Sequence, residues 1–245
     1  MKIKYSKNKD IYIYNTNALN VLKELKDKNI KVNCLLTDPP YGIDFQSAWV
    51  AKEKRKKKIL NDKQPYTEFL EVFDLHDILY KDDWSLYIFS RWDVQQQFID
   101  KLRDISNIKT KNVIIWDKVV HGMGDLKTAY GSRYESIIFS SGKDFRFTNK
   151  RPTDIIREQR VTPSKLLHPN EKPVNLYKQL LDNSVNKEDF TCLDLFAGSF
   201  ASAIACIEKG VNYIGVELDE EIYNKGVERI IKYFEDNNIE YSIDK

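Results

Sequence analysis

The chain has 245 residues, 31% of them charged and 42% hydrophobic, with a formal net charge of +2. This length and composition indicate a globular domain with a substantial core and exclude a disordered or membrane-embedded chain. No apolar stretch follows the N-terminal lysines, and no window approaches about eighteen uninterrupted apolar residues. From these absences we expect a cytoplasmic protein without a signal peptide or membrane contact. Because the net charge is only +2, we expect any nucleic-acid footprint to be local.

The cysteines are odd in number and lie inside apolar runs without CxxC spacing, at Cys34, Cys192 and Cys206. This pattern is typical of reduced core residues. We expect no disulfide and no metal site.

In the first part of the chain, strand and helix patterns alternate. Apolar spacing predicts a strand at 11–14, a helix at 18–25 and a strand at 32–36, which together form a βαβ unit with parallel pairing. Similar patterns predict a helix over 69–79, a strand at 85–90, a helix at 95–103 and strands at 113–116 and 136–140. This alternation is typical of a doubly wound sheet.

The last third of the chain contains a second βαβ unit. After an irregular basic stretch at 141–167, the pattern predicts a helix at 173–181, a strand at 190–195, a helix at 199–209, a strand at 213–218 and a final helix at 220–234. Long irregular stretches inside a compact domain are usually functional, so we expect a role for 141–167.

The strand predicted at 32–36 leads into Thr37-Asp38-Pro39-Pro40-Tyr41-Gly42. Two prolines make this loop rigid and remove two backbone donors, so it offers mainly acceptors, the Asp38 carboxylate and the Pro39 carbonyl. Such a clamp beside an aromatic ring suits an exocyclic amine on a flat base. The motif alone is also compatible with an ordinary strand-terminating turn.

A dense basic run follows, within a predicted mobile insertion at 46–66, and includes Lys54, Arg55, Lys56, Lys57 and Lys58. Like charges this close repel one another and do not favour a buried element. One interpretation is a solvated loop without a partner. Its place directly after a candidate base-binding loop favours contact with phosphates, without sequence reading.

A second candidate loop, at 194–199, joins a strand end to a helix N-terminus through small residues, so that backbone N–H groups can approach a ligand. About twenty residues later, Glu217 ends the next strand, where an acid accepts hydrogen bonds from a ribose. The turn is not GxGxxG, which favours a nucleoside with an amino-acid tail over a dinucleotide. Ordinary βαβ punctuation is the alternative.

With His168-Pro169-Asn170-Glu171-Lys172-Pro173 between them, these loops resemble the motifs of S-adenosylmethionine-dependent DNA amino-methyltransferases of the permuted, beta-group DPPY type, N6/N4 class. The resemblance covers about residues 11–234. It implies a catalytic role for Asp38, Pro39, Pro40 and Tyr41. It implies cofactor contacts for Asn17, Asp38, Pro40, His168, Lys172, Pro173, Asp194, Phe196, Ala197, Gly198, Ser199, Glu217 and Leu218.

The resemblance also implies the architecture. We expect an α/β, Rossmann-like, circularly permuted methyltransferase fold in a single domain over 1–245, with a mostly parallel seven-stranded sheet and one antiparallel strand. The strand at 136–140 would belong to a late hairpin. The stretch at 141–167 is the candidate target-recognition segment, and its candidate DNA contacts are Arg146, Lys150, Arg151 and Arg157.

The implied activity is methyl transfer from S-adenosylmethionine to the N6 amine of a flipped-out adenine in double-stranded DNA, with Tyr41 stacking on the base. Asp38 at the start of the tetrapeptide favours adenine, since cytosine-N4 members more often have Ser there. The alternatives are a cytosine-N4 enzyme, an enzyme for RNA or single-stranded DNA, and a DNA-binding module with weak or lost catalysis.

The resemblance further implies a prokaryotic or phage-encoded protein. A homodimer is an expected assembly, and a cognate restriction endonuclease is the expected partner if the enzyme is not solitary. The chain departs from the family pattern at two places. Phe200-Ala201 stands where glycine and threonine are usual, and Thr16-Asn17 stands where Gly-Asp is usual. A bulky ring in place of glycine is expected to reduce cofactor affinity or shift its pose.

Overall fold

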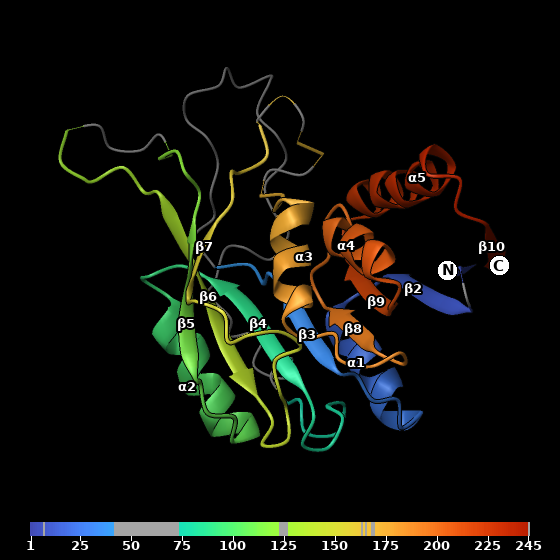
Figure 1. Ribbon diagram of the computed structural model, residues 1–245, viewed down its shortest axis with the longest axis horizontal. Coiled ribbons are helices and arrows are strands. Elements are labelled where there is room, and N and C mark those ends of the chain that lie inside the picture. Colours follow the sequence, from blue (N-terminus) through green and yellow to red (C-terminus); the bar gives the residue numbers. More distant parts are fainter. Residues whose placement is uncertain are drawn as a thin grey trace.

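A computed structural model describes the chain at residues 1–6, 8–41, 74–122, 127–162, 164, 166–167 and 170–244. These residues form a ten-stranded mixed sheet with helices on both faces (Figure 1). No helix in these ranges is long and apolar enough to cross a membrane. The basic run at 54–58 lies outside them, as does His168.

The strands are β1 (Lys2–Tyr5), β2 (Lys9–Asn15), β3 (Cys34–Thr37), β4 (Ser85–Ser90), β5 (Asn112–Asp117), β6 (Tyr134–Ser141), β7 (Ile155–Arg157), β8 (Thr191–Asp194), β9 (Asn212–Glu217) and β10 (Tyr241–Asp244). The helices are α1 (Ala18–Asp27), α2 (Gln95–Ser106), α3 (Val174–Asp182), α4 (Ala201–Lys209) and α5 (Glu220–Asp236).

The central seven strands have the order β2-β9-β8-β3-β4-β6-β5. Strand β6 pairs antiparallel with β4 and β5, whereas β2, β9, β8, β3 and β4 pair in parallel. The predicted seven-stranded arrangement with one antiparallel strand is therefore confirmed, as is the hairpin that contains the strand at 136–140.

Three short strands extend this sheet and were not predicted. Strands β1 and β10 pair antiparallel beyond β2, and Figure 1 shows both chain ends together there. Strand β7 pairs with β5 at the other edge of the sheet. The sequence suggested that the stretch at 141–167 is irregular, but the structure shows that it contains this short strand. Each of the three strands has only three or four residues, so hydrophobic periodicity gives little signal.

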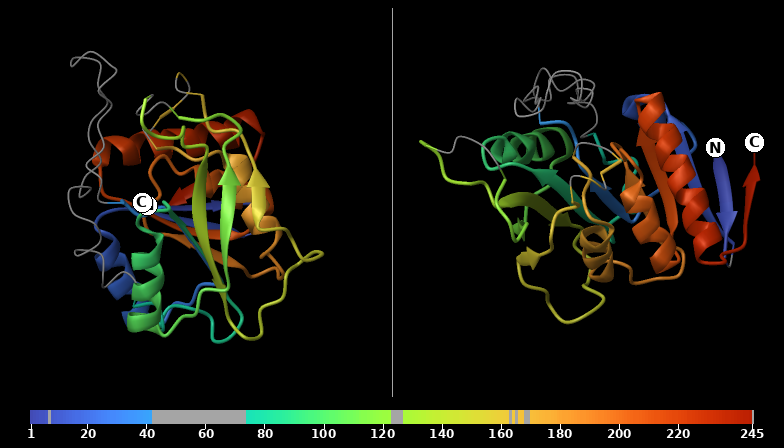
Figure 2. Two further views of the ribbon diagram at one scale, coloured as in Figure 1. Left: turned by 90° about the vertical axis from the view of Figure 1, so that its left-hand side faces the viewer. Right: turned by 90° about the horizontal axis from the view of Figure 1, so that it is seen from above.

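The helices bury two separate cores, one on each face of the sheet (Figure 2). Along β4, Tyr87 and Phe89 pack on the side of α3, α4 and α5, whereas Leu86 and Ile88 pack on the side of α1 and α2. Alternate residues of a strand point to opposite faces, so an uninterrupted apolar run suits a strand covered on both sides. The three cysteines are buried and unpaired, as predicted.

The helix expected over 69–79 is not present in its described part. Leu75, Ile78 and Leu79 are buried, but they lie in turns, and Leu79 forms a bridge with Val32. The Val32 N–H donates to the Ile78 carbonyl at 2.7 Å, and the Tyr80 N–H donates to the Val32 carbonyl at 2.9 Å. The spacing of Leu75, Ile78 and Leu79 also satisfies a helical period, but this segment forms backbone hydrogen bonds with Val32 instead of a helix.

Candidate active site

The two candidate loops leave the sheet side by side because β3 and β8 pair in parallel, with Cys34 opposite Cys192. The Thr37 hydroxyl donates to Oδ1 of Asp194 at 2.9 Å and accepts from the Leu195 N–H at 3.2 Å. Thr37 thus joins the residue before Asp38 to the first residues of the 194–199 turn. The carboxyl ends of parallel strands are where α/β sheets bind ligands.

Asp194 organises this turn from below. Its buried carboxylate also accepts from the Ser202 hydroxyl at 2.6 Å and from the Phe196 N–H at 3.2 Å. Burial raises the pKa of Asp194 to about 7, against the opposing effect of these hydrogen bonds. The Asp194 side chain is fully buried and supports the turn through these hydrogen bonds, and the cofactor contact of Asp194 stays a prediction.

The turn itself brings backbone donors to Glu217. Gly198 has a φ of 54°, a left-handed conformation that favours glycine, and its N–H donates to Glu217 Oε2 at 2.9 Å. The other carboxylate oxygen accepts from the Asp219 N–H at 2.8 Å. A carboxylate has about four acceptor sites, so Glu217 retains capacity for ribose hydroxyls. Burial raises the pKa of Glu217, and the backbone donors oppose this shift.

Two further predicted cofactor residues lie at the same edge. Asn15 pairs with Glu217 in register, which brings the start of α1 beside the end of β9. The side-chain oxygen of Asn17 caps α1 by accepting from the Leu19 N–H at 2.9 Å, and this cap does not use its NH2 group. Leu218 is exposed at the end of β9. Both positions are compatible with a purine ring, and their roles remain predictions.

The ring of Phe200 points away from this edge, into the core. It is fully buried, packs edge-on against Tyr223 at 5.9 Å between centroids, and occupies the space beside Gly215 and Gly226. Its φ of 56° is left-handed, which costs a non-glycine residue roughly 1–2 kcal/mol. Burial of the ring, worth about 1.5–3 kcal/mol, offsets this cost. The direction of the ring argues against direct obstruction of the cofactor by Phe200, and the effect of Phe200 on cofactor affinity stays a prediction.

The Asp38 carboxylate is held by two side chains. Tyr41 donates its hydroxyl proton to Oδ1 at 2.6 Å, and the Lys172 ammonium donates to Oδ2 at 2.5 Å. Burial raises the pKa of Asp38, and the Lys172 charge opposes the rise. The structure places the Lys172 ammonium on the Asp38 carboxylate, and the predicted cofactor contact of Lys172 stays a prediction. Tyr41 is only 7% exposed. The structure therefore supports a role of its hydroxyl in holding Asp38 more than the predicted stacking of its ring on a base.

Two functional candidates at this cluster were not predicted. The Lys172 ammonium is 3.3 Å from Glu135 Oε2, and the Lys118 ammonium is 3.2 Å from Glu135 Oε1. Burial opposes the charge of each group, but the opposite charges outweigh it: the pKa of Lys172 is raised and that of Glu135 is lowered. An acidic residue directly before the apolar strand 136–140 was the one available sequence signal.

The segment before α3 is anchored to the same turn. Glu171 pairs with Arg229 of α5 at 2.8 Å, and Arg229 also donates to the Ser199 hydroxyl at 3.1 Å. The neighbouring Lys172 reaches Asp38, and the buried Pro173 caps α3. The structure thus brings together the described parts of all three predicted motifs.

The candidate DNA contacts at 141–167 lie partly at the amino ends and partly at the carboxyl ends of the parallel strands. Strand β6 ends where β4 begins, with Ser141 opposite Ser85. Arg146, Lys150 and Arg151 therefore follow at the amino ends of the parallel strands, whereas Asp38 lies at their carboxyl ends. Strand β7 then returns parallel to β5 and brings the exposed Arg157 opposite Asp117, near the Asp38 edge. Of these four residues, Arg157 therefore lies on the side of the sheet where Asp38 lies, and the DNA contacts of the segment stay predictions.

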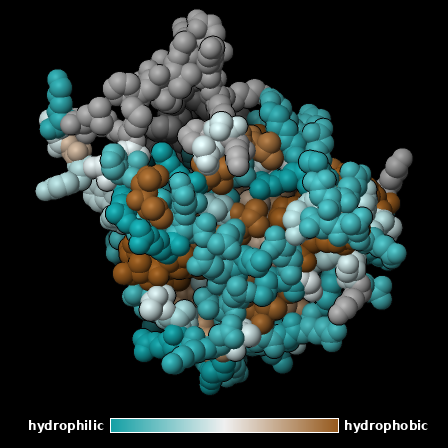
Figure 3. Space-filling model, turned by 45° about the horizontal axis from the view of Figure 1, so that its top comes forward, coloured by the Kyte–Doolittle hydropathy of each residue, from teal (hydrophilic) through white to brown (hydrophobic). Residues whose placement is uncertain are grey.

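The described face in Figure 3 is mostly hydrophilic, with hydrophobic residues in small separate patches. Several exposed aromatic side chains nevertheless follow the strand ends near the site. Trp92 lies just after β4, and Tyr130 and Tyr134 lie between β5 and β6 or at the start of β6. Aromatic faces at such an edge suit contacts with nucleobases.

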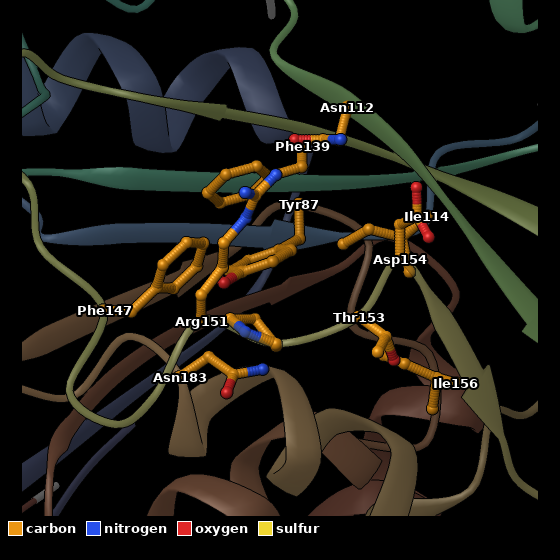
Figure 4. Close-up of a pocket in the computed structure, with 11 residues that line it drawn as sticks. Tyr87, Asn112, Ile114, Phe139, Phe147, Arg151, Thr153, Asp154, Ile156 and Asn183 are labelled. Atoms are coloured by element: carbon orange, nitrogen blue, oxygen red, sulfur yellow. The ribbon is translucent and has the colours of Figure 1, made fainter.

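A cavity of about 220 Å³ lies away from the site, at the opposite edge (Figure 4). Its wall includes Asn112 at the start of β5, Asp154 before β7 and Asn183 after α3. Figure 4 shows the Arg151 side chain running alongside the ring of Phe139. Because these residues lie at the amino ends of the parallel strands, the cavity is not part of the Asp38 site.

Comparison with known proteins agrees with this arrangement. A family model described as DNA methylase, of N6/N4 type, matches residues 32–228. DNA adenine methyltransferase YhdJ of Escherichia coli (strain K12) is 27% identical over 254 residues, which cover 89% of this chain and 82% of that protein.

Two solved structures have the same fold. The M1.HpyAVI-SAM complex is 20% identical with a TM-score of 0.67, over 89% of this chain and 99% of that one. The PvuII DNA methyltransferase, described as cytosine-N4-specific, is 13% identical with a TM-score of 0.68, over 89% of this chain and 86% of that one.

Proposed function

Since this chain belongs to the N6/N4 family of DNA methylases, and is thus a DNA methyltransferase of that class, we propose that it methylates the N6 amine of adenine with S-adenosylmethionine as donor. The observation that carries the proposal is the Thr37–Asp194 hydrogen bond of 2.9 Å. It holds an acceptor loop suited to an amine against a turn suited to a nucleoside.

The residues present fit S-adenosylmethionine, which supplies an electrophilic methyl group when bound. Glu217 has acceptor capacity for the ribose hydroxyls, and the Asn17 NH2 group lies at the edge where an adenine ring would follow. Leu218 offers an apolar contact for that ring. The left-handed Gly198 lets the turn approach a ligand closely.

Asp38 accepts a hydrogen bond from the target amine in this proposal, and the Pro39 carbonyl accepts from the second amine hydrogen. The lone pair of such an amine is delocalised into its ring, so two acceptors localise it for attack. Burial raises the pKa of Asp38, which makes its carboxylate a better proton acceptor than an exposed one. An amine inside a duplex is out of reach, so the base must leave the stack.

Adenine is favoured over cytosine by two observations. The catalytic tetrapeptide begins with Asp38, and the E. coli relative is named an adenine methyltransferase. The PvuII structure, named cytosine-N4-specific, keeps cytosine as the second candidate. Arg157 and the exposed aromatic residues at the Asp38 edge are the proposed DNA contacts among described residues. A homodimer and a paired restriction endonuclease remain predictions.

The test is to incubate unmodified plasmid DNA with the protein and labelled S-adenosylmethionine, then separate the nucleosides by chromatography. We expect N6-methyladenine; N4-methylcytosine would identify the alternative activity. Asp38→Ala should abolish transfer yet bind S-adenosylmethionine nearly as the wild type does in calorimetry. Asp82→Asn, at a 3.0 Å ion pair with Lys143 on the opposite edge, is the matched control and should methylate normally.

A further inference from the structure

We propose that Glu135 is a positioning residue that takes over the Lys172 ammonium from Asp38 when the target amine binds Asp38. The inference rests on the proposed function, because it concerns how Asp38 becomes free to accept an amine hydrogen. Glu135 lies on β6, next to Ser136, which pairs with Ser90 at the end of β4. This position puts its carboxylate at the carboxyl end of β4, on the side of the sheet where Asp38 lies.

The need for such a residue follows from the contacts of Asp38. The Lys172 ammonium donates to one Asp38 carboxylate oxygen at 2.5 Å, and the Tyr41 hydroxyl donates to the other at 2.6 Å. A charge-assisted hydrogen bond from an ammonium is about twice as strong as one between neutral groups. These bonds leave acceptor sites free on the Asp38 carboxylate, but the adjacent Lys172 charge attracts its electron density, so a neutral nucleobase amine is held less strongly while Lys172 remains there.

Lys172 has little freedom to release Asp38 into solvent. Its side chain is 5% exposed, and its ammonium lies 5.3 Å from the centre of the Phe89 ring and 5.9 Å from that of Tyr41. An ammonium buried among rings without a carboxylate is strongly unfavourable, because breaking a buried ion pair leaves a charge without compensation. The ammonium therefore requires a second anion within reach.

Glu135 has the geometry for that role. Its Oε2 is buried, lies 3.3 Å from the Lys172 nitrogen and accepts no hydrogen bond within the described part of the chain. Its Oε1 is fixed by Lys118 at 3.2 Å. Lysine has three donors on a flexible stem, so a small rotation changes the ion pair with Glu135 into a full hydrogen bond. The negative charge of Asp38 Oδ2 then acts on the amine in place of the ammonium.

The test is a double-mutant cycle on Glu135→Gln and Lys172→Met, measured as methyl incorporation at saturating DNA and S-adenosylmethionine. We expect Glu135→Gln to lower kcat at least about 10-fold while the Kd for S-adenosylmethionine stays within about 2-fold. In the Lys172→Met background, Glu135→Gln should change kcat less than about 2-fold, because its effect passes through Lys172. Asp82→Asn again serves as the carboxylate-to-amide control.

Wild-type kcat in Glu135→Gln would overturn the inference, as would an equal loss in both backgrounds or a loss of S-adenosylmethionine binding in the single variant. Thermal melting of each variant verifies that it is folded. Absence of methylation by the wild-type protein would instead refute the proposed function itself, so the two failures are distinguishable.

Discussion

Thr37 and Asp194, which are far apart in the sequence, are joined by a 2.9 Å hydrogen bond between hydroxyl and carboxylate. The same hydroxyl accepts from the Leu195 N–H at 3.2 Å. One side chain therefore satisfies a buried acceptor and a buried donor, and it joins the strand end before Asp38 to the turn that precedes α4.

Thr37→Val should weaken both stability and cofactor binding, because valine keeps the shape but removes the hydroxyl. Each buried polar group left without its partner costs about 1–3 kcal/mol. We expect the free energy of unfolding to fall by about 1–3 kcal/mol in guanidinium titrations, and affinity for S-adenosylmethionine to fall in calorimetry. Thr37→Ser keeps the hydroxyl and should retain affinity; an equal loss in both variants would argue against the hydrogen bond as the cause.

Phe200→Ala should destabilise the protein by roughly 3–5 kcal/mol, because it empties the space beside Gly215 and Gly226. The ring does not face the cofactor edge, so affinity for S-adenosylmethionine in the folded variant should change little. Denaturant unfolding and calorimetry measure the two effects separately. Phe200→Leu, which fills part of the space, should lose less stability. A large gain in cofactor affinity on removal of the ring would show that it obstructs the site.

Asp194→Asn should reduce the pH dependence of stability. The pKa of Asp194 rises from 3.8 to about 7 on folding, so between these values the folded protein binds a proton that the unfolded chain does not. The free energy of unfolding of the wild type therefore falls as pH rises through this window, by at most a few kcal/mol from this group. Asparagine does not titrate.

The relevant quantity is the difference in unfolding free energy between Asp194→Asn and wild type, measured from about pH 4 to pH 8. We expect the variant to gain relative stability as pH rises to 7 and the difference to level off above it. Titration of groups common to both proteins cancels in this comparison. A constant difference would mean that the pKa of Asp194 is not raised in the folded state.

Arg157→Gln should weaken DNA binding, whereas Arg151→Gln should not. Both arginines are exposed and belong to the same segment, but only Arg157 lies near the Asp38 edge. Loss of one phosphate contact lowers affinity for all sequences alike and reduces the log–log salt slope by about 1. Fluorescence anisotropy with duplex DNA at several salt concentrations measures both; a larger effect of Arg151→Gln would place DNA on the opposite edge.

The sequence by itself determined the elements and the loops that carry the chemistry. Periods of 2 and 3.6 predict all five helices of the described chain, together with a helix at 69–79 that its described part does not form, and strand-end chemistry singles out Asp38, Gly198 and Glu217. These features depend on neighbours along the chain. In strands of only three or four residues, as in β1, β7 and β10, the same patterns gave no signal.

Only the tertiary structure decided which side chains meet at the site. The pairing of Lys172 with Asp38, the third partner Glu135 and the buried position of Asp194 all join segments more than thirty residues apart. Strand order and register set these distances, and short sequence patterns do not encode them. The same reason explains Phe200, whose ring direction follows from glycines on β9 and α5, and the separation of Arg151 from Arg157 by the course of β7.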